Sequence, residues 1–292
     1  MTPPTTQHTR SEQPGTATEP TAAPVLSVRD VHITDRASGR EIVHGVSFDL
    51  TPGRTVGIVG ESGSGKTLTC RAALGILPPH FEVTAGSIEI AGTDITTLTP
   101  ARWTALRATT ISAVFQDPAS YLNPSIRVGA QIAEVLRVKT GLTRREARDR
   151  TLELLRAVHL RDPELVRVQY PHELSGGMLQ RVLIAAAIAA GPRILIADEA
   201  TTALDVTVQA EILDLLADLR ERTGLALVVV SHDLAVVAQL CDEVLVLRHG
   251  EVVEQGPVRS VLHDPRHDYT RLLIAEHEQY GLERFRPAKE HA

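Results

Sequence analysis

The sequence GESGSGKT decides the fold of this 292-residue chain, and it comprises Gly60, Glu61, Ser62, Gly63, Ser64, Gly65, Lys66 and Thr67. It follows an apolar, β-prone segment at residues 55–59 and precedes a segment with helical character at residues 67–77. Glycines let the backbone wrap with its N–H groups facing inward, and a helix N-terminus adds positive potential. We therefore expect a loop that binds a polyphosphate through its main chain, with Lys66 reaching the β and γ phosphates and the Thr67 hydroxyl binding Mg²⁺.

A second candidate motif is the pair Asp198-Glu199, which directly follows the apolar segment ILIA at residues 194–197. Continuous apolar runs of this kind are typical of buried parallel strands. A phosphate-binding loop needs a carboxylate from a neighbouring strand to hold its metal ion, and Asp198 is placed to do so. Glu199 would point toward the γ phosphate, where a carboxylate can polarise an attacking water. The sequence thus predicts Asp198 as a Mg²⁺ ligand and Glu199 as a general base.

The pattern of apolar residues indicates an α/β fold. Short β-prone segments at residues 25–33 and 42–50 predict a strand-rich start. The helical segment 207–223 separates the apolar segments 194–197 and 225–230, which together form a βαβ unit. Such a unit implies a parallel sheet whose ligand lies at the carboxyl ends of the strands.

Composition divides the chain into three expected parts. Residues 1–24 are dominated by Thr and Pro and cannot offset the entropy of ordering by burial, so we predict a disordered tail. Residues 25–257 are predicted to form the nucleotide-binding domain, with a helical subdomain at about 117–180 where the periodicity becomes helical. Residues 258–292 are predicted to form a C-terminal extension.

Bulk properties exclude several classes of protein. The longest apolar run, residues 182–190, is about half as long as a membrane-spanning helix, and the N-terminus lacks the pattern of a secretory signal. A formal charge of −6 without a strongly basic block argues against nucleic acid as the partner. Cys70 and Cys241 lie outside any metal-ligand spacing, which fits packing residues in a reducing compartment. We expect a cytoplasmic location.

Histidines give little support for a metal centre. His263, His267 and Asp268 come closest to a ligand cluster, but their spacing is loose and Pro265 interrupts it. We interpret them as surface residues.

Phosphate-binding loops such as GESGSGKT occur in many protein families, so the loop alone does not identify the class of protein. The segment LSGGMLQR at residues 174–181 identifies it more closely. It resembles the signature motif of ABC ATPases and stands, as in that family, just upstream of the metal-binding strand. Further matches follow in the family's order: Gln116 in FQDP resembles the Q-loop, TALD at residues 202–205 resembles the D-loop, and His232 in SHD resembles the switch histidine. The resemblance covers residues 25–257 by motif.

This resemblance implies a P-loop NTPase of the ABC ATPase type, with a mixed sheet core, an antiparallel β lobe and an inserted α-helical subdomain. Ser175, Gly176 and Gly177 begin a helix, so their N–H groups and the serine hydroxyl can form a second anion site. In the family that site closes on the γ phosphate held by another subunit, so two chains enclose two ATP molecules.

The family also implies roles for three further polar residues. Gln116 would approach the metal ion and the water and link the nucleotide state to the membrane partner. His232 would hydrogen-bond the γ phosphate and help to position the water, and Asp205 of the D-loop would contribute to the nucleotide site. Each of these residue types could instead be structural, as a lone histidine after a buried strand usually is.

Two departures from the family pattern stand out. Family members often place an aromatic residue before the loop to stack on adenine, yet residues 25–47 contain none; His32, His44 or Arg36 are possible substitutes. Met178 occupies a signature position where glutamine is commoner, while Ser175 and its two glycines are intact. We expect hydrolysis to be retained.

Several segments resemble the peptide, opine and nickel uptake branch of bacterial importers, namely GESGSGKT, SGGMLQR, the Leu-Asn-Pro after Asp117-Pro118, and HDYTRLL at residues 267–273. Residues 275–282 look more like those of nickel or metallophore importers. The resemblance implies an ATPase on the cytoplasmic face of the cell membrane, with two transmembrane permease subunits, a second ATPase subunit that is identical or homologous, and, indirectly, a solute-binding protein. A cysteine cluster that some peptide-importer ATPases carry is absent, so no iron–sulfur centre is expected.

Two other functions are compatible with a nucleotide-binding fold of this type. A soluble ABC ATPase acting on DNA or ribosomes would be expected to carry paired cassettes, a long coiled-coil insertion or basic extensions, and the sequence shows none of these. A module that senses ATP without hydrolysing it would not need Glu199 and His232.

Overall fold

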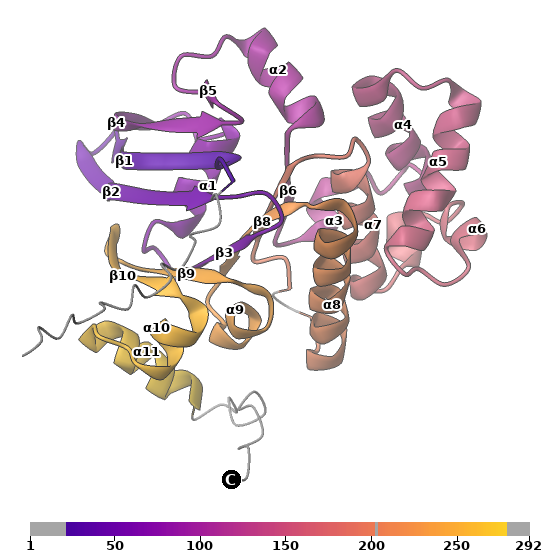
Figure 1. Ribbon diagram of the computed structural model, residues 1–292. Coiled ribbons are helices and arrows are strands. Elements are labelled where there is room, and N and C mark those ends of the chain that lie inside the picture. The colour runs from indigo at the N-terminus through magenta and orange to yellow at the C-terminus, as the bar shows by residue number, and fades with distance from the viewer. Residues whose placement is uncertain (1–21, 202–203, 279–292) are drawn as a thin grey trace, which may run out of the picture.

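The computed structural model describes residues 22–201 and 204–278 of the chain, which form two sheets flanked by helices (Figure 1). The four-stranded sheet has the order β2 (Arg40–Leu50), β1 (Leu26–Asp35), β4 (Phe81–Ile90), β5 (Thr93–Asp94). The six-stranded sheet has the order β10 (Glu251–Pro257), β9 (Glu243–Arg248), β3 (Thr55–Val59), β8 (Ala226–Ser231), β7 (Ile194–Asp198), β6 (Ile111–Phe115). The first sheet is antiparallel, as predicted for the β lobe.

The six-stranded sheet is mixed, because β3, β6, β7, β8 and β9 pair in parallel while β10 pairs antiparallel to β9. Every residue of β3, β7 and β8 is buried, which explains their continuous apolar sequences. α8 (Val206–Thr223) connects β7 to β8, and Ile194 pairs with Ala226, so the predicted βαβ unit is confirmed. Val59 lies opposite Ser231, and Asp198 opposite Val230. The register therefore brings the GESGSGKT loop, the Asp198-Glu199 pair and His232, which stand at the ends of β3, β7 and β8, to one edge of the sheet.

Most predicted elements agree with the structure, but the helix predicted at residues 67–77 ends early. α1 spans Lys66–Leu74 and stops because Gly75 adopts a left-handed conformation with φ of 62°. The Gly75 and Ile76 N–H groups donate to the carbonyls of Ala72 and Arg71 at 3.0 Å each, which closes the helix. α2 (Pro100–Thr109) follows the antiparallel sheet and leads into β6.

The segment between β6 and β7 is largely helical, and Figure 1 shows α4, α5 and α6 set to one side of the sheets. Its helices are α3 (Pro118–Tyr121), α4 (Val128–Thr140), α5 (Arg144–Ala157), α6 (Pro163–Val166), the 3₁₀ helix η1 (Pro171–Glu173) and α7 (Gly176–Ile188). Thr143 and Glu146 form a capping box that fixes the start of α5. Buried residues of α4, α5 and α7 share one apolar cluster with those of β7, β8 and α8. The boundaries of about 117–180 remain a prediction.

The C-terminal helices pack beneath the six-stranded sheet. α9 (Leu234–Leu240), α10 (Val258–His263) and α11 (Asp268–Glu278) contribute to an apolar cluster with β3 and β9. The predicted extension 258–292 is thus described as far as residue 278, and the predicted tail 1–24 lies outside the described residues except for 22–24. Within the described ranges, no helix has both the length and the hydropathy required to span a membrane.

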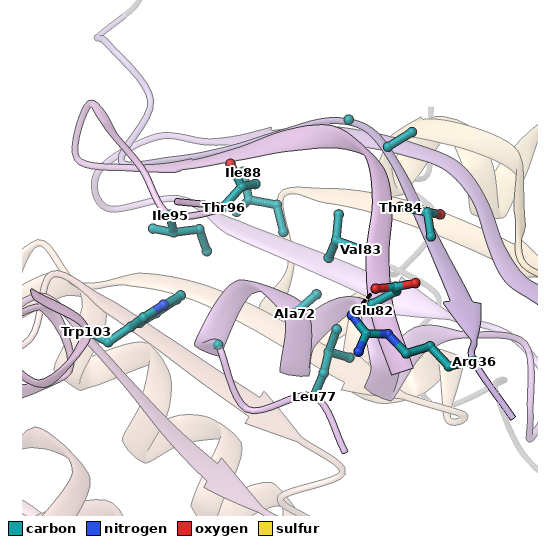
Figure 2. Close-up of a pocket in the computed structure, with 13 residues that line it drawn as sticks. Arg36, Ala72, Leu77, Glu82, Val83, Thr84, Ile88, Ile95, Thr96 and Trp103 are labelled. Atoms are coloured by element: carbon teal, nitrogen blue, oxygen red, sulfur yellow. Dashed lines mark hydrogen bonds and ion pairs between the residues drawn. The ribbon is translucent and has the colours of Figure 1, made fainter. Parts of the chain in front are cut away.

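A pocket of about 440 Å³ opens between the antiparallel sheet, α1 and α2 (Figure 2). Trp103 forms one wall, and the ion pair between Arg36 and Glu82 lies at another. Among the described residues, its lining includes Arg36 but no residue of the GESGSGKT loop. The two other candidates for stacking on adenine, His32 and His44, both contact the carboxylate of Glu41 on the β1–β2 hairpin, at 2.5 and 3.2 Å.

Candidate active site

The GESGSGKT loop runs from the end of β3 to the start of α1. Gly60 has a φ of 147°, and a Cβ there would lie 2.0 Å from the carbonyl oxygen of Leu247, so the close approach of β9 requires glycine. Gly65, with a φ of 100°, caps α1. α1 therefore begins within the loop, and the N-terminus of a helix placed in this way favours a bound anion.

Lys66 is held inside its own loop. Its Nζ donates to the carbonyl oxygens of Gly60 and Glu61, each at 2.7 Å, and the residue is only 5% exposed. Burial lowers the pKa of Lys66, and the carboxylates of Glu199 and Asp198 oppose that shift. The loop thus positions a nearly buried ammonium group beside two acidic side chains.

Thr67 and Asp198 come together although 131 residues separate them. The Thr67 hydroxyl donates to Oδ1 of Asp198 at 3.2 Å. Burial raises the pKa of Asp198, the bond from Thr67 opposes the rise, and nearby Glu199 adds to it. A buried carboxylate beside a second carboxylate is stabilised by a cation, and carboxylate and hydroxyl oxygens are ligands that Mg²⁺ prefers. These residues fit the predicted metal site.

Glu199 adopts an unusual backbone conformation at the end of β7. Its φ is 51°, a region that costs a non-glycine residue about 1 kcal/mol or more, and its N–H donates to Val230 at 3.0 Å. The carboxylate lies 3.7 Å from Nδ1 of His232, which follows β8. The kinked backbone and the neighbouring strand therefore place the predicted base and the predicted switch histidine side by side.

A polar pocket of about 580 Å³ lies beside Thr67, Asp198 and Glu199. Its lining consists of Ser62, Thr67, Arg71, Phe115, Gln116, Asp117, Ser120, Tyr121, Asp198 and Glu199. Gln116 belongs to it because Phe115, the last residue of β6, lies opposite Asp198 in the sheet. Sequence reasoning missed Arg71, whose charge opposes the raised pKa of Asp198. Its position four residues after Thr67, on the same face of a helix, is the signal that could have identified it.

Ser175, Gly176 and Gly177 lie elsewhere, at the start of α7. The Ser175 hydroxyl caps the helix by accepting from the Met178 N–H at 3.4 Å. Gly177 is packed so closely against α8 that a Cβ would lie 2.6 Å from a Val208 methyl group. Ser175 and Gly176 are exposed, and none of the three lines the pocket beside Asp198. The structure therefore does not bring this predicted anion site to the loop of the same chain.

Asp205 caps the neighbouring helix α8. Its Oδ1 accepts from the Val208 N–H at 3.0 Å. Thr202 and Ala203 of the same predicted motif lie outside the described residues. Capping explains an aspartate at this position in structural terms, and its contact with nucleotide stays a prediction.

Comparison with known proteins assigns this set of motifs to a family. The family described as "ABC transporter" matches residues 43–202, which include the loop, the capped α7 helix and the Asp198-Glu199 pair. The chain belongs to the ABC transporter family. It is an ABC ATPase, so the predictions of family, fold and enzyme class are confirmed.

Relatives of this ABC ATPase are named as transport proteins. It is 47% identical over 88% of its length to the peptidoglycan transport ATP-binding protein YejF of Agrobacterium fabrum, and it spans 48% of that protein. It is 43% identical to the dipeptide transport ATP-binding protein DppD of Haemophilus influenzae over 86% of this chain and 76% of DppD. With the oligopeptide transport ATP-binding protein OppD of Bacillus subtilis it shares 44% identity, over 86% and 71% of the two chains.

Solved ABC ATPase structures resemble the fold of this chain. The ATP-binding cassette MJ0796, described as dimeric and bound to ADP and Pi, superposes with a TM-score of 0.71 at 30% identity, covering 80% of this chain and 99% of the cassette. CbiO1 of Clostridium perfringens, described as part of the transporter complex CbiONQ, gives a TM-score of 0.73 at 26% identity over 89% and 96% of the two chains.

Proposed function

We propose that the chain is the ATP-hydrolysing subunit of an ABC importer that takes up peptides, nickel or metallophore-like solutes. One observation carries this proposal: β3, β7 and β8 bring Lys66, the Thr67–Asp198 pair and the Glu199–His232 pair to one edge of the sheet. The transport names of its relatives favour an importer over a soluble ABC ATPase, and among solutes they favour peptides.

In this proposal each group at the sheet edge has one task. Main-chain N–H groups of the loop bind the phosphates of ATP, and Lys66 neutralises charge on the β and γ phosphates. Thr67 and Asp198, with Gln116 nearby, would hold Mg²⁺, which would supply positive charge that offsets the negative charge of the phosphates. Glu199 orients the attacking water and accepts its proton, while His232 donates to the γ phosphate and keeps the carboxylate in place.

The remaining anion site acts between subunits. Ser175 and Gly176, at the start of α7, are exposed, so they are placed to contact a γ phosphate held by another ATPase subunit. That subunit is an identical copy or a homologous ATPase, and Asp205 belongs to the same contact. The dimeric cassette MJ0796 supports this arrangement.

Transport requires membrane partners. We propose two permease subunits, engaged by the helical segment that follows Gln116, and a solute-binding protein that delivers the cargo to them. The ATPase then lies on the cytoplasmic face of the membrane.

Uptake measurements test the proposed function. Replacing Glu199 by Gln in the chromosomal gene should abolish ATP-dependent uptake of the transported solute, assayed with labelled di- and oligopeptides and with ⁶³Ni²⁺, while the protein still co-purifies with membrane permeases. Normal uptake of all these solutes, or a chain recovered without any membrane partner, would contradict the proposal.

A further inference from the structure

Tyr269 connects the C-terminal helix α11 to the GESGSGKT loop. It is 2% exposed, and its ring packs in the apolar cluster beneath β3 and β9. The guanidinium of Arg248, at the end of β9, lies over that ring at 4.7 Å from its centre. The ring is thus enclosed on the sheet side of α11.

The Tyr269 hydroxyl contacts one peptide group of the loop. It accepts a hydrogen bond from the N–H of Glu61 at 3.0 Å. The carbonyl of that same peptide group belongs to Gly60, and it accepts from Lys66 Nζ at 2.7 Å. The N–H and C=O of a trans peptide point in opposite directions. Tyr269 therefore bonds to the N–H on one side of this peptide group, and Lys66 bonds to the C=O on the other side.

The segment that carries Tyr269 is itself anchored to the sheet. The carboxylate of Glu254, on β10, accepts from the N–H groups of Arg266 and His267 at 2.8 and 3.1 Å. His267 Nδ1 in turn accepts from the N–H of Tyr269 at 3.1 Å. These bonds fix the start of α11 relative to β10, and the apolar cluster fixes its buried face. The hydroxyl is therefore presented to the loop by a rigid support.

We propose that Tyr269 is a positioning residue for ATP binding: its hydroxyl orients the Gly60–Glu61 peptide group, and through that group the ammonium of Lys66. This inference rests on the proposed binding of ATP at the loop. It gives the C-terminal extension a direct part in nucleotide binding. Without the hydroxyl the peptide plane can rotate about its two flanking bonds, and the carbonyl that holds Lys66 rotates with it.

The test compares Tyr269→Phe with the wild-type full-length chain. Phenylalanine keeps the buried ring and removes only the hydroxyl. We expect ATP to bind about five-fold more weakly, the effect of one lost hydrogen bond, with a matching rise in KM for ATP and an unchanged kcat. Hydrogen exchange of the Glu61 amide should accelerate, measured on peptides that cover residues 57–68. Leu272→Ala, at an exposed position of the same helix, is the control and should change neither quantity.

Two kinds of result, one from the variant and one from the wild type, would overturn the inference. One is a Tyr269→Phe chain that binds ATP as the wild type does, or that loses kcat and thermal stability with no change in KM, since the tyrosine would then only pack. The other is a wild-type Glu61 amide that exchanges as fast as an unprotected loop amide, a result that needs no variant. Absence of ATP binding by the wild-type chain would reject the proposed function as well. The exchange measurement would still show whether the Glu61 N–H is hydrogen-bonded to the Tyr269 hydroxyl.

Discussion

The two candidate anion sites of this chain differ in how far the chain itself completes them. At the GESGSGKT loop, Lys66 and Asp198 are each 5% exposed, and their polar atoms bond to groups of the same chain. At the start of α7, Ser175 and Gly176 are exposed, and the serine satisfies one N–H of its own helix.

This difference follows from the free energy of burying charge. A buried ammonium or carboxylate must find partners inside the fold, so the loop site has its shape before any ligand arrives. Helix N–H groups at the surface are satisfied by water and can exchange it for a phosphate. We infer that the loop site binds nucleotide within one chain, whereas the α7 site contributes to hydrolysis only after association.

The largest effect is expected for Glu199→Gln, which should reduce ATP hydrolysis without reducing ATP affinity. Glu199→Gln keeps the size of the side chain but cannot accept a proton, so ATP hydrolysis should fall by about 10²- to 10⁴-fold while ATP affinity is retained. Steady-state phosphate release and equilibrium binding of ATP measure the two quantities. Glu221→Gln, an exposed acid on α8, is the control and should hydrolyse normally. Normal turnover of Glu199→Gln would remove this residue from its proposed role.

A substitution at the exposed site should reduce turnover through association. Ser175→Arg places a bulky cation over the start of α7 and removes its hydroxyl cap, so hydrolysis should fall by about 100-fold. Ser260→Arg, at an exposed position of α10, controls for the added charge. If phosphate release by Ser175→Arg equals that of the control, the proposed contact between subunits is wrong.

Lys66→Ala tests the site at the GESGSGKT loop, whose polar groups all belong to one chain. Loss of a charged hydrogen bond to the phosphates should weaken ATP binding by about 10- to 100-fold. Lys139→Ala is the matched control, because Lys139 is also partly buried but donates to the carbonyl of Arg107 in another part of the fold. Isothermal titration with ATP and Mg²⁺ measures the affinity, and equal affinities of the two variants would argue against the assignment of Lys66.

The smallest effect on ATP binding is expected at the pocket of Figure 2, whose described lining includes no residue of the GESGSGKT loop or of the start of α7. Gly75→Ala should destabilise the fold by about 2–3 kcal/mol, because φ is positive there and a Cβ would lie 2.4 Å from the Trp103 ring. Gly141→Ala has a positive φ but open space, so it should cost only about 1 kcal/mol. Urea unfolding followed by the fluorescence of Trp103 measures both, and ATP affinity should not change. Equal stabilities would show that the clash with Trp103 relaxes.

Local patterns made most of the fold predictable. The loop, the strand before Asp198 and the βαβ unit are each encoded within a few consecutive residues, and the sheet register then brings them together. Glu199 is predictable for the same reason, since it follows a buried strand. The role of His232 is predicted instead from the resemblance of SHD to the switch histidine of the family, because a histidine after a buried strand is usually structural.

Residues whose roles depend on distant partners were not predictable in this way. Tyr269 contacts Glu61 across 208 positions, and no periodicity in either segment indicates that bond. The early end of α1 depends on the left-handed conformation of Gly75, and a glycine inside a helical pattern does not by itself reveal its φ. The exposure of Ser175 likewise depends on how α7 packs against α8.

The most direct test measures ATP affinity of dilute, monomeric Ser175→Arg and Lys66→Ala chains side by side, by titration with ATP and Mg²⁺. Ser175→Arg should bind ATP as tightly as the wild type, while Lys66→Ala should bind it at least about ten-fold more weakly. If Ser175→Arg lost as much affinity as Lys66→Ala under these conditions, both sites would serve the same chain, and the division between a complete loop site and an intersubunit site would be wrong.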